Sequence, residues 1–387
     1  MKSVVIELYK KYYYKIYAAM IFIMFAFYIV MILEGYGQDL LLRVSESKYF
    51  IKGINPYDVF IGKVDRIHGY GMSHAYSFFS YYFASVFLLF ENSIWQKIIY
   101  SIIDILSLVV GIYLVEEMAC EERNLTGPIT IFILLISVFF WKHVMSLNYT
   151  FIIALGLILT FYGIYKNSRL LGVFGVVILG LKPSFAMPVF IYLLFSKKWN
   201  ILFYSVLCYG VTLICTSCII DTNPLDILLQ IKSTQARFTI NNPYKLAYTD
   251  GFFFFIKSLL GDKITAFGVL VTSAVIFLLR RYIIDPLSAL ILVTALGISL
   301  FYNHEHIWII IYPLLIYSIS RLFSNKIPLL PCILLLVFIL TPRMARLVSP
   351  EYLYLYLAVH NIIRFGLLYV SAYLLIKNRL LKIEYRC

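Results

Sequence analysis

Long apolar runs separated by short polar breaks dominate the hydrophobic pattern of this chain. A helix that crosses a bilayer needs about 20 apolar residues, and fewer when it is shielded by its neighbours. On this rule the pattern predicts about twelve membrane helices in one all-α, polytopic membrane helix bundle that spans residues 1–387. The expected helices cover residues 18–33, 94–115, 128–141, 149–165, 169–181, 184–196, 200–220, 264–279, 283–301, 307–320, 327–341 and 353–376.

Two longer segments between the apolar runs are expected to form external loops, the first over about 35–93 and the second over about 221–250. The first loop opens with Asp39 and continues as an amphipathic helix that stops at Gly53 and can lie flat in the membrane interface. Its polar positions are Arg43, Ser45, Glu46, Ser47 and Lys48. The sequence Asn55-Pro56-Tyr57-Asp58 is expected to be a turn, because proline pushes the residue before it out of the α region.

Apolar segments rich in aromatic residues are also expected inside or beside these loops. Residues 74–90 combine apolar character with many Tyr, Ser and Phe side chains, which favours an interfacial or re-entrant segment over a span. Residues 251–260 are likewise expected to form an interfacial or re-entrant segment. The first external loop is therefore expected to be structured and to contain interfacial helices.

Composition excludes a soluble globular protein. The hydrophobic share is 62%, charged residues make up 14%, and the mean hydropathy is +0.87. A net charge of +13 would suggest a nucleic-acid partner in a soluble chain, but here the positive-inside rule explains it. About half of the 33 Lys and Arg residues fall in short segments that are inside if the N-terminus is inside. Both termini are therefore expected in the cytoplasm, with the basic N-terminus as part of a retained anchor.

Asp39 is the first candidate for chemistry, because an acid at the mouth of a membrane helix is costly and marks a functional site. This region resembles the first external loop of GT-C glycosyltransferases, in which an acid after the first membrane helix is followed by an amphipathic helix and then by a motif like G-x-N-P-Y-D here. The resemblance is closest to family 87, the polyprenol-phosphate-mannose-dependent mannosyltransferases. It implies a GT-C-type fold, with Asp39 as the catalytic base. Asp58, beside Tyr57, is the competing base, although an acid in such a turn often bonds only its own backbone.

Lys182 interrupts an apolar stretch within the sequence GLKPSFAMP. One interpretation is a hairpin turn whose lysine extends to the lipid headgroups. The other is a cation that neutralises a phosphate. Family 87 members carry a similar Lys-Pro pair, so the resemblance implies phosphate binding by Lys182. The polar turn at residues 146–148 precedes this helix pair and makes Asn148 a secondary candidate.

A late polar cluster, Asn303 to His306, is expected at the outer end of a helix. His304 and His306 flank Glu305, but residues two apart do not share a helix face, and a zinc site needs three or four ligands. No metal is therefore expected. The alternatives are interfacial histidines without a role and, by resemblance to a family motif, residues that line the sugar-phosphate site.

Arg343 and Arg346 are expected on an outer turn. They are either interface anchors or part of the binding site for the lipid phosphate. The chain has no Walker motif and no D-x-D motif, so the nucleotide-sugar route with a bound metal lacks its ligands.

The resemblance implies an integral-membrane glycosyltransferase in a bacterial plasma membrane, with its active site facing outside. It would transfer a hexose, mannose first among them, from a polyprenyl-phosphate donor to a lipid-linked or cell-surface glycan acceptor, with inversion. It would need no cofactor beyond the lipid-phosphate donor, its other partners would be membrane lipids, and it would not bind nucleic acid. The rival interpretations are a polysaccharide polymerase or ligase that uses lipid-pyrophosphate glycans, and a non-enzymatic lipid or solute transporter.

Overall fold

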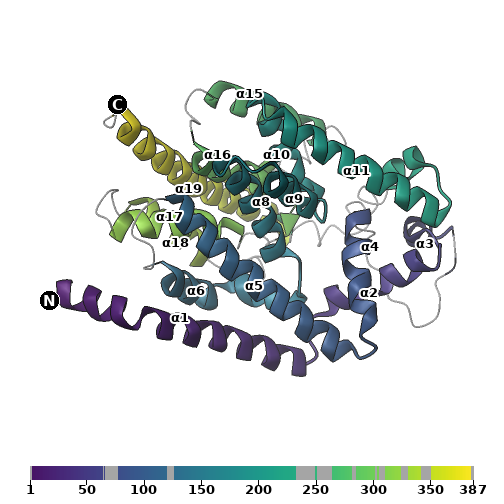
Figure 1. The fold of residues 1–387 in the computed structure, drawn as a ribbon, viewed down its shortest axis with the longest axis horizontal. Helices are drawn as coiled ribbons and strands as arrows, with labels where there is room; N and C mark the ends of the chain where they lie inside the picture. Colours follow the sequence, from purple (N-terminus) through teal and green to yellow (C-terminus); the bar gives the residue numbers. More distant parts are fainter. Residues whose placement is uncertain are drawn as a thin grey trace.

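The computed structural model describes residues 2–63, 65, 77–119, 126–231, 249–250, 264–280, 285–300, 303–304, 310–323, 330–340 and 350–384. These residues are almost entirely helical (Figure 1). The helices outside the first loop are α1 (Lys2–Leu33), α5 (Ser93–Ala119), α6 (Gly127–Ile136), α7 (Val138–Ser146), α8 (Thr150–Tyr165), α9 (Arg169–Leu179), α10 (Pro183–Phe195), α11 (Trp199–Ile220), α15 (Ile264–Leu279), α16 (Pro286–Leu300), α17 (Tyr312–Phe323), α18 (Leu330–Leu340) and α19 (Pro350–Glu384). The prediction of an all-α class is confirmed.

The described strands are two residues long each. β1 (Thr249–Asp250) pairs antiparallel with β2 (Asn303–His304). This pairing brings the end of the second predicted external loop next to the start of the histidine cluster.

Three described helices are long and apolar enough to cross a membrane: Lys11–Leu33 within α1, and the whole of α5 and α11. The pair α6 and α7 would make a fourth if it counted as one broken span. Several shorter apolar helices accompany them, among them α8, α9 and α10. The chain is therefore a membrane protein by the length and composition of its helices. The number of twelve spans stays a prediction.

Most of the predicted apolar runs coincide with helices, but residues 128–141 do not form one helix. They divide between α6 and α7, whose axes differ by 78°. The break lies at Ser137, whose backbone is extended with φ −79° and ψ 132°. Its hydroxyl accepts a hydrogen bond from the backbone N–H of Phe139, which caps the start of α7. The single-helix prediction was wrong here because a local serine cap competes with helix continuation.

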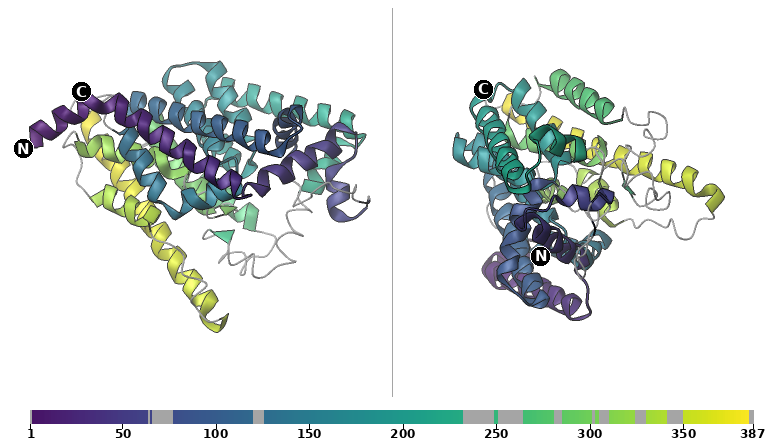
Figure 2. Two further views of the ribbon diagram at one scale, coloured as in Figure 1. Left: turned by 90° about the horizontal axis from the view of Figure 1, so that it is seen from below. Right: turned by 90° about the vertical axis from the view of Figure 1, so that its right-hand side faces the viewer.

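Helix α5 runs through the middle of the bundle and packs against α1, α8 and α17 (Figure 1). Helices α8 and α9 pack closely because glycines face each other. A Cβ added at Gly163 would lie 2.3 Å from the backbone nitrogen of Gly172, so no side chain fits there. Figures 1 and 2 place the N-terminal end of α1 and the C-terminal end of α19 toward the same end of the molecule.

The first predicted loop begins at the other end of α1, and its described residues form the helices α2 (Gln38–Ile51), α3 (Pro56–Ile61), α4 (Phe78–Ser85) and the short 3₁₀ helix η1 (Val86–Leu89). The prediction of a turn at residues 55–58 was wrong, because these residues begin α3. Asn55 is the N-cap, and its side chain accepts the N–H of Tyr57 at 3.0 Å. Pro56 takes the first helical position, where its missing N–H costs nothing.

Candidate functional site

The site begins at the reversal between α1 and α2. Gly37 has φ +89°, a left-handed conformation that favours glycine, and its N–H donates to the carbonyl of Met145 at 2.9 Å. A Cβ at Gly37 would lie 2.5 Å from Cδ1 of Leu147. Leu147 itself has φ +52° and ends α7. Two left-handed residues therefore bring the start of α2 against the turn between α7 and α8.

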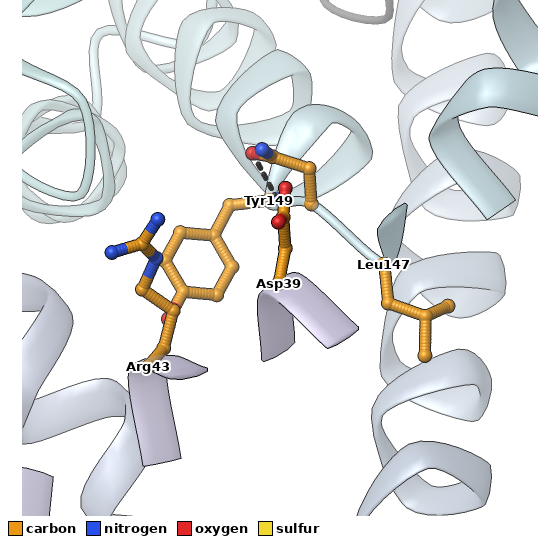
Figure 3. A pocket seen from close by; sticks show the side chains of 5 residues that line it. Asp39, Arg43, Leu147 and Tyr149 are labelled. Atoms are coloured by element: carbon orange, nitrogen blue, oxygen red, sulfur yellow. Dashed lines mark hydrogen bonds between the residues drawn. The ribbon is translucent and has the colours of Figure 1, made fainter. Parts of the chain in front are cut away.

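Asp39 faces this turn from the first helical turn of α2. It lines a small, tightly packed pocket with Arg43, Leu147, Asn148 and Tyr149 (Figure 3). The pocket is too small to enclose a complete lipid-linked sugar.

The Asn148 side chain stabilises the charged form of Asp39 through a hydrogen bond to its carboxyl group. The Asn148 Oδ1 accepts the backbone N–H of Tyr149 at 2.8 Å (Figure 3), so the Nδ2 group is the donor to Asp39. Burial raises the pKa of Asp39 above its ordinary value, and Arg43, the Asn148 hydrogen bond and Lys182 oppose that rise. A carboxyl with a raised pKa is a better proton acceptor than an exposed one.

Lys182 precedes α10 as its N-cap residue, with an extended backbone and its N–H bonded to the carbonyl of Leu179 at 2.9 Å. Its side chain is 8% exposed and does not reach the surface as the headgroup interpretation requires. Among the described residues Nζ has no hydrogen-bond partner. Burial and the charge of Arg43 lower the pKa of Lys182 to about 7, while Asp39 opposes this shift. The structure therefore brings together Asp39, Asn148 and Lys182, three residues that the sequence predicted separately.

Arg43 is the site residue that sequence reasoning missed. It was expected on the polar, exposed face of an interfacial helix, together with Glu46 and Ser47. The structure buries all three, at 4%, 0% and 0% exposure, because α2 packs between α4 and α7. Arg43 Nη1 bonds both carboxylate oxygens of Glu46, at 3.0 and 3.1 Å. The available signal was an arginine and a glutamate three residues apart in a loop of low net charge.

Asp58 and Tyr57 are not among the residues that line the Asp39 pocket. Asp58 accepts a hydrogen bond from the side chain of Gln230 at 2.9 Å and pairs with Lys63 at 3.3 Å. Gln230 also accepts from Asn55 at 2.9 Å. Asp58 therefore links α3 to the residues that follow α11. Tyr57 is buried against the ring of Tyr81 at 5.8 Å between centroids.

Four predicted site residues lie outside the described part of the chain: Glu305, His306, Arg343 and Arg346. His304 belongs to β2, opposite Thr249 of β1. Within the residues that the structure describes, no group of three or more His, Cys, Asp or Glu side chains could hold a metal ion. The expectation of a metal-free site stays a prediction.

Comparisons with protein-family models, with curated proteins and with solved structures find no match to this chain. The resemblance to glycosyltransferase family 87 thus rests on the motifs around Asp39, Lys182 and the histidine cluster alone.

Proposed function

We propose that the protein is a GT-C-type integral-membrane glycosyltransferase with about twelve spans. It transfers a hexose, with mannose as the first candidate, from a polyprenyl-phosphate donor to a lipid-linked or cell-surface glycan acceptor on the external face of a bacterial plasma membrane. One observation carries the proposal. The partly buried carboxylate of Asp39 shares its surroundings with the buried side chains of Lys182 and Arg43. A base beside two cations matches a displacement that consumes a proton acceptor and releases a phosphate.

The reaction assigns one role to each group. Asp39 accepts the proton of the acceptor hydroxyl while that oxygen attacks the anomeric carbon. The bond from the anomeric carbon to the phosphate oxygen breaks, and its electron pair leaves with the polyprenyl phosphate. Lys182 and Arg43 stabilise the negative charge that develops on the leaving phosphate. A single displacement inverts the anomeric centre.

Asn148 and Glu46 act by holding the reacting groups in place. The Asn148 amide donates to Asp39, which fixes the carboxylate plane relative to the acceptor. Glu46 bonds the Arg43 guanidinium through both carboxylate oxygens, so this cation keeps its position before any donor arrives. Such fixed groups stabilise developing charge without reorganising during the reaction.

The test is transfer by the purified protein in detergent or proteoliposomes, supplied with a panel of polyprenyl-phosphate sugars. Release of polyprenyl phosphate is measured for the native protein and for the matched variants Asp39→Asn and Asp58→Asn. Loss of a general base costs about 10²- to 10⁴-fold in rate, so Asp39→Asn should lose nearly all transfer. Asp58→Asn should keep a sizeable share, because Asp58 bonds Gln230 and does not line the pocket.

The opposite ranking of the two variants would make Asp58 the base. If neither variant slows transfer, the mechanism is wrong. Absence of turnover with every monosaccharide donor would favour the rival functions. Turnover with a lipid-pyrophosphate glycan would then identify a polymerase or ligase, and uptake without turnover would identify a transporter.

A further inference from the structure

A second buried polar cluster lies within the helices, away from the pocket. Asp104 is near the middle of α5 and is fully buried, as are Tyr28 on α1 and His143 on α7. The Tyr28 hydroxyl donates to Asp104 Oδ2 at 2.7 Å, and His143 Nε2 lies 2.6 Å from the same oxygen. The same Asp104 oxygen therefore accepts the Tyr28 hydroxyl and shares a second hydrogen bond with the imidazole of His143. One oxygen atom therefore joins three helices.

Burying such a cluster among membrane helices costs free energy. Acidic residues inside spanning segments are rare and mark a function, because removing a charge from water costs several kcal/mol. The apolar residues around the cluster would pack without it. The cluster does not line the Asp39 pocket, so the proposed chemistry does not use it directly.

The cluster is connected to the pocket through α7. His143 lies in the last turn of α7, and its carbonyl accepts the N–H of Leu147 at 2.8 Å and the hydroxyl of Ser146 at 3.0 Å. One turn before Asp104 on α5, the Tyr100 hydroxyl donates to the carbonyl of Asn148 at 2.6 Å. Residues 143–148 are therefore bonded to α5 at both ends.

Helix α7 needs such an anchor because it is nine residues long and separated from α6 by the 78° bend at Ser137. An isolated helix of this length is marginal, and the helix before it does not fix its direction. Apolar packing alone resists separation of α7 from its neighbours, but it does not fix rotation about the helix axis as well as a short hydrogen bond does.

We propose that Asp104, acting through His143, is a positioning residue that sets the α7–α8 turn and so orients Asn148 toward Asp39. The link from Asp104 to the turn is a geometric inference and stands without the proposed function. Its consequence for transfer rests on that function. The experiment therefore needs one readout of the turn itself and one of the reaction.

The turn is read by a cysteine at Leu147, which is 1% exposed in the native fold. The six native cysteines are first replaced by serine or alanine, and Leu147→Cys is then reacted with a water-soluble maleimide. Four backgrounds are compared: the native one, Asp104→Leu, the double change Asp104→Leu/His143→Leu, and Ser101→Ala. Ser101 is the matched control, since it is buried on α5 but its hydroxyl bonds only its own helix at Lys97.

Asp104→Leu should raise the labelling rate roughly ten- to a hundredfold, the factor that corresponds to losing a hydrogen bond to a charged group. The double change removes both members of the pair but leaves the Tyr28 hydroxyl without its acceptor, so the melting temperature should recover only in part while labelling stays high. Ser101→Ala should label as slowly as the native background. If the double change restores both stability and slow labelling, the pair only holds the bundle together, and the proposal is overturned.

If the Asp104→Leu protein fails to insert into the membrane, the labelling rate and melting temperature of the double change decide whether the proposal holds. For transfer, the double change should lower kcat by about tenfold or more with little change in KM, because the donor-binding cations are untouched. An equal loss in Ser101→Ala would overturn the positioning role. If the native protein shows no transfer with any donor, the proposed function fails, and the labelling result still decides whether Asp104 sets the turn.

Discussion

Replacing Lys182 by methionine should stabilise the ligand-free protein while abolishing its use of a phosphate-bearing donor. Methionine has nearly the length of lysine and carries no charge. The lysine side chain is 8% exposed, and its ammonium has no hydrogen-bond partner among the described residues. A buried charge without a partner opposes folding, so removing it should raise the free energy of unfolding.

The size and pH dependence of this effect follow from the pKa of Lys182, which burial lowers from 10.5 to about 7. A difference of this size corresponds to roughly 5 kcal/mol, at 1.36 kcal/mol per unit. Because the pKa is lower in the folded state, the unfolded state binds more protons between pH 7 and pH 10.5, and stability rises with pH across that window. The opposition to folding is complete below pH 7 and absent above pH 10.5.

Thermal unfolding in detergent measures the effect, with Lys198→Met as the matched control because Lys198 is exposed. Lys182→Met should raise Tm by several degrees at pH 6, and the gain should shrink toward zero by pH 10. Lys198→Met should change Tm little at any pH. Added polyprenyl phosphate should stabilise the native protein. Above pH 7 the affinity should fall by up to tenfold for each pH unit, since the neutral amine of Lys182 must take up a proton before it pairs with the phosphate.

Two results would refute the reasoning. If Lys182→Met destabilises the protein at pH 6, the ammonium has a stabilising partner and is not held ready for a ligand. If polyprenyl phosphate stabilises Lys182→Met as strongly as the native protein, then Lys182 does not bind the phosphate, whatever its effect on folding.

Two further predictions concern the same site. Gly37→Ala should destabilise the fold by more than the roughly 1–2 kcal/mol that a left-handed alanine costs, and it should slow transfer. Gly35→Ala is the matched control, because Gly35 has φ +87° and no atom near its added Cβ, so it should show only the backbone cost. Equal Tm values for the two variants would contradict the close contact between Gly37 and Leu147. Arg43→Gln should cost about 3–5 kcal/mol, because it removes the cation that is paired with the buried Glu46 carboxylate. Arg43→Gln/Glu46→Gln should recover most of that stability but no transfer. Recovered transfer in the phosphate-release assay would exclude Arg43 from donor binding.

The helices could be predicted because run length in a membrane chain is set by the bilayer, and the run expected at 264–279 is helix α15. The break at Ser137 could not, since a serine within an apolar run gives no signal unless its side chain is known to cap. The short helix α3 was mistaken for a turn because proline after asparagine is typical of both turns and helix starts.

Asp39 and Lys182 could be singled out from the sequence because each is an ionisable residue next to a long apolar run. Their proximity could not be predicted, because 143 positions separate them and only the folded arrangement of α2 and the start of α10 brings them together. Arg43 was missed for a different reason. An amphipathic pattern assumes one apolar and one solvated face, whereas α2 is covered on its polar face as well.

Asp104 could have been identified from the sequence as a candidate functional residue, since it is an acid in the middle of an apolar run. Its partner His143 lies 39 residues away in a segment whose bend was not foreseen. A pairing of this kind depends on how two helices rotate about their axes, and hydrophobic periodicity defines that rotation poorly when helices are apolar on all sides.

The position of the candidate site follows from where regular helix geometry is interrupted. In a membrane chain, irregular backbone is tolerated only where the protein itself satisfies its hydrogen bonds. The N–H groups of Gly37, Leu147 and Lys182 all donate to nearby carbonyls, so each interruption is satisfied before any ligand binds. The backbone around the pocket is thus already arranged, and the ammonium of Lys182, close to Asp39 and Arg43, has no hydrogen-bond partner among the described residues. A ligand that brings an anionic oxygen to that atom would give it a partner, so the pH dependence of Lys182 directly measures whether an anion binds beside Asp39.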